Sequence, residues 1–199
     1  NSTGVGGTLT FENAPTGAGS RVLLLSDIID VPVASYTIDN TYINSTYDTY
    51  EFLCTFEASA DGARLRQLFF TTINFEGDAG VVIAGSNTGA ESASTGASTY
   101  RAFNAEARAE IGAVTSGNGL GEAIHFHMIL HNANSPFHNL ICSGTGGNIT
   151  TNGAHGGFSF STGAATPVTY HPHFCRGMQF IWDSGNIDRG SVLLYGVKK

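Results

Sequence analysis

Charged side chains are scarce in this sequence. Only 13% of the 199 residues are Asp, Glu, Lys or Arg, and 9 basic residues against 16 acidic ones give a net charge of −7. Binding to nucleic acid phosphates needs a basic stripe, so we expect no nucleic acid partner. No apolar run approaches the roughly 18 residues that a membrane-spanning helix requires, and we expect no membrane insertion.

Cysteine is rare as well. The three cysteines, Cys54, Cys142 and Cys175, form no C-x-x-C pair, and an odd number cannot complete a disulfide framework. We interpret them as buried thiols that pack like small apolar residues. With so little charge, the surface must take its polarity from Ser, Thr, Asn and Gly, which is common in all-β proteins and in proteins of larger assemblies.

Strand patterns run along most of the chain. Residues 50–58 alternate, with Phe52 and Phe56 on one face, and 21–29, 64–75 and 123–132 are further strands. Residues 103–111 are interpreted as one strand, and the Gly-, Ser- and Thr-rich stretches 84–98 and 143–157 as long loops. The sequence therefore predicts an all-β protein: a single-domain antiparallel β-sandwich or jelly roll of about 10 to 13 short strands over residues 8–199, after a flexible arm at 1–7.

The segment 177–197 organises the predicted fold. Met178, Phe180 and Trp182 share one apolar face, and an apolar run at 192–197 follows a connection rich in turn residues. We expect a closing hairpin inside the sandwich, with Trp182 buried. The predicted structural core contains Phe52, Phe56, Phe126, Phe180, Trp182 and Leu194.

This ending resembles the C-terminal signature of a family of tailed-phage virion proteins, F-x-F-S-S-G-N-I-x-x-G-x-x-x-L-Y-G-x-K. The matching residues are Phe180, Trp182, Ser184, Gly185, Asn186, Ile187, Gly190, Leu194, Tyr195, Gly196 and Lys198. Weaker similarities lie at 47–52, 61–63 and 96–101, in a similar order and spacing, so the resemblance covers about residues 47–199.

The resemblance implies a non-enzymatic structural protein on the surface of a phage particle. We expect a tail or fibre component that contacts the host, a host surface glycan or neighbouring virion proteins; a capsid decoration protein is the alternative within this class. Low charge and long neutral loops favour close contact between chains, so we expect a homo-oligomer. A trimer is expected because fibre and decoration proteins are often trimeric.

Two histidine pairs are the candidates for a metal site. His125 and His127 share one strand face, which also carries His131, and His171 and His173 repeat the H-x-H spacing. If the two strands were neighbours, four imidazoles could converge on zinc or iron, as in a jelly-roll metalloenzyme. No carboxylate accompanies either pair in the sequence. The alternative is that the opposite face, with Phe126 and Met128, forms the core and the histidines face outward.

Other motifs point to turns more than to chemistry. The acidic residues that we interpret as turn formers are Asp27, Asp30, Asp61, Asp78, Asp183 and Asp188, of which Asp183 and Asp188 could also bind calcium. The glycine run 117–121 lacks the Lys and helix of a phosphate loop. We expect no catalytic residue and no cofactor. Seven tyrosines keep a free carbohydrate-binding module open as an alternative: Tyr36, Tyr42, Tyr47, Tyr50, Tyr100, Tyr170 and Tyr195.

Overall fold

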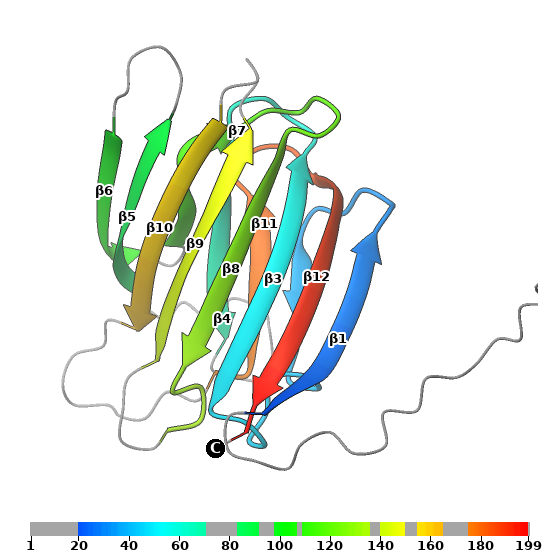
Figure 1. The fold of residues 1–199 in the computed structure, drawn as a ribbon, viewed down its shortest axis with the longest axis vertical. Helices are drawn as coiled ribbons and strands as arrows, with labels where there is room; N and C mark the ends of the chain where they lie inside the picture. The colour runs from blue at the N-terminus through cyan, green and yellow to red at the C-terminus, as the bar shows by residue number, and fades with distance from the viewer. Residues whose placement is uncertain are drawn as a thin grey trace, which may run out of the picture.

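The computed structural model describes residues 20–70, 83–91, 98–106, 109–135, 140–149, 155–164 and 175–198. Within these ranges the chain forms twelve β-strands and no helix (Figure 1). The strands are β1 (Arg21–Ile29), β2 (Tyr36–Ile38), β3 (Thr49–Ala58), β4 (Ala63–Phe70), β5 (Ile83–Glu91), β6 (Ser98–Glu106), β7 (Ala109–Ser116), β8 (Ala123–His131), β9 (Ile141–Ile149), β10 (His155–Ala164), β11 (Gly177–Trp182) and β12 (Ile187–Val197). No described helix is long and apolar enough to cross a membrane.

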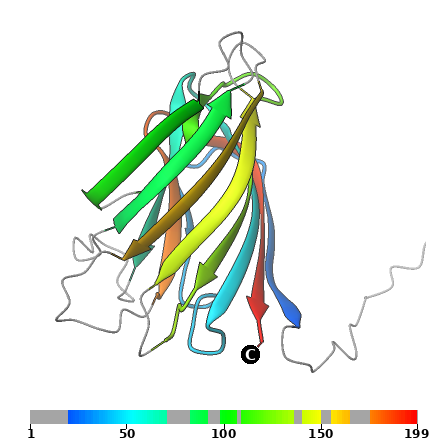
Figure 2. The ribbon, with the colours of Figure 1, turned by 60° about the vertical axis from the view of Figure 1, so that its left-hand side comes forward.

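Two antiparallel sheets stack face to face, so the predicted β-sandwich is confirmed. The larger sheet has the order β1-β12-β3-β8-β9-β10-β5-β6, and the smaller has the order β2-β11-β4-β7. Figures 1 and 2 show the smaller sheet behind the centre of the larger one. The jelly-roll connectivity stays a prediction.

Aromatic side chains fill the space between the sheets. All six residues of the predicted core are buried. The ring of Phe180, on β11 of the smaller sheet, lies 5.3 Å from Phe56 and 5.7 Å from Phe126 between centroids, both on the larger sheet. Burial of large apolar side chains supplies the main driving force for folding, so this cluster holds the two sheets together.

The predicted closing hairpin is wrong. β11 pairs with β2 and β4 in the smaller sheet, whereas β12 pairs with β1 and β3 in the larger one. The turn between them carries the chain from one sheet to the other, and Gly185 there has a positive φ of 73°. Two apolar strands in sequence can pair or lie in opposite sheets, and both arrangements bury the same faces.

The two predicted glycine-rich loops are also wrong in the parts of them that the structure describes. Residues 83–91 form β5, hydrogen-bonded between β10 and β6, and 141–149 form β9 between β8 and β10. Strand propensity depends on the sheet context, which supplies hydrogen-bond partners on both sides. In β9 the glycines have a packing reason: a methyl carbon at Gly144 would lie 2.7 Å from the ring of Phe160.

The predicted strand at 103–111 is divided in two. β6 ends at Glu106 and belongs to the larger sheet, whereas β7 begins at Ala109 and pairs with β4 in the smaller one. An alternating pattern does not reveal that the chain changes sheets within it. The predicted arm at 1–7 lies outside the described residues.

Candidate functional site

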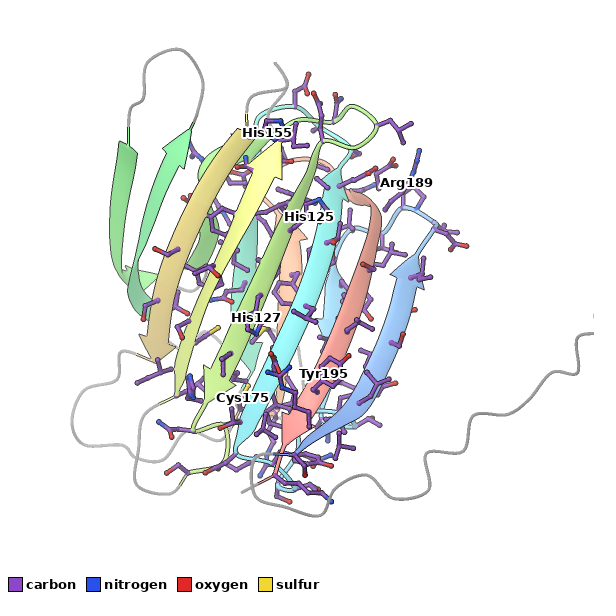
Figure 3. All side chains as sticks on the ribbon, in the orientation of Figure 1. His125, His127, His155, Cys175, Arg189 and Tyr195 are labelled. Atoms are coloured by element: carbon purple, nitrogen blue, oxygen red, sulfur yellow. The ribbon has the colours of Figure 1, made fainter. Side chains whose placement is uncertain are left out.

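The candidate site lies on the outer face of the larger sheet, where β12, β3, β8 and β9 run side by side. Because side chains alternate along a strand, the residues between the buried core positions point outward here. The strand register aligns them in rows, one of which joins Leu193, Leu53, His127 and Thr145. Figure 3 shows His125 and His127 along β8 and Tyr195 on β12.

Glu51 is a buried carboxylate on this outer face, with an exposed fraction of only 4%. His127 Nε2 donates a hydrogen bond to Glu51 Oε1 over 2.7 Å, and Arg21 Nε lies 2.7 Å from Glu51 Oε2. A desolvated carboxylate is costly unless donors or cations meet it, and here both oxygens are met. Glu51 therefore fixes the orientation of the His127 ring and ties β1 to β3.

His125 is held by a second polar contact. Its Nδ1 lies 2.9 Å from Thr55 Oγ1, on the directly opposite residue of β3. Two imidazoles two residues apart on one strand are thus both fixed by side chains of the neighbouring strand. Leu53 lies between Glu51 and Thr55 on that strand, and 38% of its surface is exposed.

Two adjacent hollows open beside these side chains. The larger, of about 420 Å³, is lined by Leu53, Cys54, Thr55, His125, Phe126, His127, Thr145, Gly146, Ser191 and Leu193. The smaller, of about 250 Å³, is lined by His127, Ile129, Ser143, Gly144, Thr145 and Phe160. They share His127 and Thr145. We call the two hollows together the outer groove, whose lining combines imidazoles, hydroxyls and aliphatic side chains.

Only the first histidine pair of the predicted metal site, His125 and His127, lies in the described part of the chain. His171 and His173 lie outside the described residues, so their position relative to β8 is not part of this structure. Among the described residues no group of three or more His, Cys, Asp or Glu side chains is placed to hold a metal ion. The opposite face of β8 is buried, including Phe126 and Met128, as the alternative interpretation required.

Sequence reasoning missed Glu51 as the partner of His127. The two residues are separated by 75 others, and only the register of β3 against β8 brings them together. Glu51 follows the alternation of β3, whose outward positions also include Thr55 and Glu57, so no signal in the sequence distinguishes it from a solvated strand residue.

Of the acidic residues predicted in turns, Asp27 and Asp188 instead lie within β1 and β12, because their side chains reach solvent from strand positions. Asp183 Oδ1 accepts a hydrogen bond from Arg64 N over 2.8 Å, and Asp183 Oδ2 lies 3.5 Å from Arg66 Nη2. Asp188 pairs with its neighbour Arg189. In the glycine run, Gly119 N donates to Glu122 Oε2 over 2.6 Å, so this backbone N–H group is already paired with a carboxylate of the chain. Asp78 lies outside the described residues.

The tyrosines divide between core and surface. Tyr50 is fully buried, and Tyr36, Tyr42 and Tyr47 pack against the core. Tyr195 stands on the outer face, in the row that contains Glu51, Ile129 and Ser143. Tyr170 lies outside the described residues. Among the tyrosines whose side chains the structure describes, only Tyr195 stands beside the outer groove.

Comparison with known proteins assigns no family. No protein-family model, no curated protein and no solved structure matches this chain.

Proposed function

We propose that this chain is a non-enzymatic structural protein of a tailed-phage virion, exposed on the particle as part of the tail or a fibre. One observation carries the proposal: the residues that match the virion-protein signature include buried core side chains from strands of both sheets. The signature thus corresponds to a structural unit with a definable physical role.

Four signature residues belong to the core. Phe180 and Trp182 are buried on β11, and Ile187 and Leu194 are buried on β12. Since β11 and β12 lie in different sheets, these side chains contribute apolar surface from both sides of the sandwich. A chain that carries the same pattern would close a sandwich in the same way.

Three signature glycines are needed for their small size or backbone geometry. Gly185 has a φ of 73°, which residues with a Cβ rarely adopt. A methyl carbon at Gly190 would lie 2.5 Å from the carbonyl oxygen of Thr55, and one at Gly196 would lie 2.6 Å from the ring of Tyr47. The residue types at the signature positions are therefore constrained by the space available, by the turn geometry and by burial in the core. This supports a shared fold with the virion proteins.

The expected position is the particle surface, with neighbouring virion proteins as partners. The low charge of the chain, 13% charged residues, supports contact with other chains, because neutral groups cost less to desolvate than ions. Self-association, for which the resemblance implies a trimer, belongs to the same proposal. A capsid decoration protein is the alternative location.

Mass spectrometry and immunogold labelling of density-purified particles test this proposal. Particles of a phage that encodes the chain should contain its peptides, and antibodies against the recombinant protein should label the tail or fibres. Labelling of the capsid would favour the decoration alternative. Particles of a phage from which the gene is deleted provide the control and should not be labelled. Particles of the unaltered phage that contain no peptide of the chain would contradict the proposal.

A further inference from the structure

We propose that the outer groove binds a neutral saccharide, through the imidazoles of His125 and His127, the hydroxyl groups beside them and the aliphatic side chains of Leu53 and Leu193. This goes beyond the proposed place in a virion and does not depend on it, because it rests on the lining of the groove alone.

The imidazoles are fixed before any ligand arrives. Glu51 holds one edge of the His127 ring and is itself held by Arg21, both at 2.7 Å, and Thr55 holds His125 at 2.9 Å. His127 is nevertheless 44% exposed and lines both hollows. A polar group whose orientation is already fixed loses less entropy when it binds, so these rings are suited to contact a ligand.

The groove lining contains no Asp, Glu, Lys or Arg among the described residues. The charges next to the groove, Glu51 and Arg21, already pair with each other, so a charged ligand would lose hydration here without meeting an unpaired opposite charge. A neutral ligand with many hydroxyl groups would instead exchange water for the hydroxyls of Thr55, Thr145 and Ser191. The chemistry of the lining therefore selects an uncharged, hydrogen-bonding molecule.

Aliphatic surface lies next to these polar groups. Leu53 and Leu193 face each other across β3 and β12, and Ile129 lines the smaller hollow. A sugar ring presents C–H groups on its faces and hydroxyls around its edge. Such a ring can contact the aliphatic side chains and the neighbouring polar groups of the groove at the same time. A purely apolar peptide would leave the imidazoles and hydroxyls without partners, at a cost for each buried group.

The dimensions suit a ligand of more than one sugar unit. The larger hollow, about 420 Å³, and the smaller, about 250 Å³ beside it, are both shallow and open to solvent, which suits an extended ligand that lies along the sheet. Because His127 and Thr145 line both, one extended molecule could contact them while lying across β3, β8 and β9. This places His127 at the centre of the bound saccharide.

A titration followed by NMR tests the proposal with defined probes. The full-length chain, with leucine methyl groups labelled, is titrated with maltotriose, cellotriose, triacetylchitotriose and mannotriose, and with trigalacturonic acid as a charged comparison. At least one neutral trisaccharide should shift the Leu53 and Leu193 methyl signals saturably, with a Kd of about 1 mM or tighter. Trigalacturonic acid should bind about tenfold more weakly or not at all.

Matched variants locate the contact. Glu51→Gln should weaken binding about tenfold, because His127 loses its charged partner, and Thr145→Val should do so without disturbing a buried group. His155→Ala is the control, since this exposed histidine on β10 lies outside the groove lining. Folding of each variant is checked from its NMR spectrum, and Thr145→Val decides if Glu51→Gln fails to fold.

Three results would overturn the inference. The first is that none of the four neutral trisaccharides gives a saturable shift. The second is that Thr145→Val binds with the same affinity as the unchanged protein. The third is that His155→Ala weakens binding as much as Thr145→Val does. The competing occupant is a second copy of the chain packed on this face. If sedimentation shows a dimer that Leu53→Glu dissociates, and no trisaccharide binds, the face is a protein interface. Failure here leaves the particle location untouched, because that is measured on virions.

Discussion

Replacing Phe180 by Ala removes the central contact between the two sheets. Phe180 is fully buried on β11, and its ring centroid lies 5.3, 5.7 and 6.5 Å from those of Phe56, Phe126 and Phe52, which belong to the larger sheet. Because this one side chain touches residues from two strands of the opposite sheet, its loss leaves a cavity that neither sheet can fill alone.

The expected loss of stability is large. Truncation of a buried Phe to Ala typically costs about 3 to 5 kcal/mol, which includes the lost burial and the cavity. Small domains are stable by about 5 to 15 kcal/mol, so Phe180→Ala should remove about a fifth or more of the free energy of unfolding. Phe180→Leu should cost about 1 to 2 kcal/mol, since Leu fills part of the same space.

Urea unfolding measures both values. Trp182 is the single tryptophan of the chain and is buried, so its fluorescence reports the native core, with far-UV circular dichroism as a second probe. Ile28→Ala is the control: its side chain is 75% exposed, and the change should stay within about 0.5 kcal/mol. A Phe180→Ala protein that unfolds within about 1 kcal/mol of the unchanged chain, with the same denaturant slope, would refute the role of this aromatic cluster.

Four further predictions concern the same interior. Among the described residues Trp182 Nε1 is buried without a hydrogen-bond partner, so Trp182→Phe should cost much less in thermal denaturation than Trp182→Ala, which should cost about 3 kcal/mol or more. Burial raises the pKa of all three cysteine thiols, that of Cys175 to about 12. Ellman's reagent at pH 8 should therefore modify them only in urea. Because the unfolded chain releases thiol protons that the folded chain keeps, the unfolding free energy should fall as the pH rises from about 9 towards 12, by up to about 1.4 kcal/mol per thiol and pH unit. Gly144→Ala should destabilise by about 1 to 3 kcal/mol in urea unfolding, because the added methyl meets the Phe160 ring and the His127 carbonyl; an unchanged midpoint would show that β9 has room there.

The sequence predicts those strands that carry their own apolar face. β3 and β8 alternate between large apolar and polar residues, so their existence and their buried sides, with Phe52 and Phe126, follow from periodicity. β9 has the sequence ICSGTGGNI and brings little apolar surface of its own. Its glycines make room for rings from β10 and β8, a requirement that is visible only once the neighbours are known.

The sequence predicts only part of the candidate site, as it predicts only some of the strands. The spacing of His125 and His127 places both on one face of a strand, and the alternating apolar residues Ile124, Phe126 and Met128 assign the opposite face to the core. The pairing of His127 with Glu51 depends on the register between β3 and β8, and a shift by one residue would turn Glu51 away from the groove. Register is a property of the assembled sheet, so single-strand patterns do not contain it.

Strand β8 presents two histidines to the outer groove and most of its apolar side chains to the core. The geometry of the groove therefore depends on the packing of the core. Phe126 alternates with His125 and His127 on β8, and its ring lies 6.0 Å from Phe56 and 6.3 Å from Phe160 between centroids. These contacts fix the position of β8 relative to β3 and β10. The hydrogen bonds that aim the two imidazoles require that position to hold within a few tenths of an ångström. The precision of the outer groove is therefore supplied by the aromatic core on the other side of the sheet.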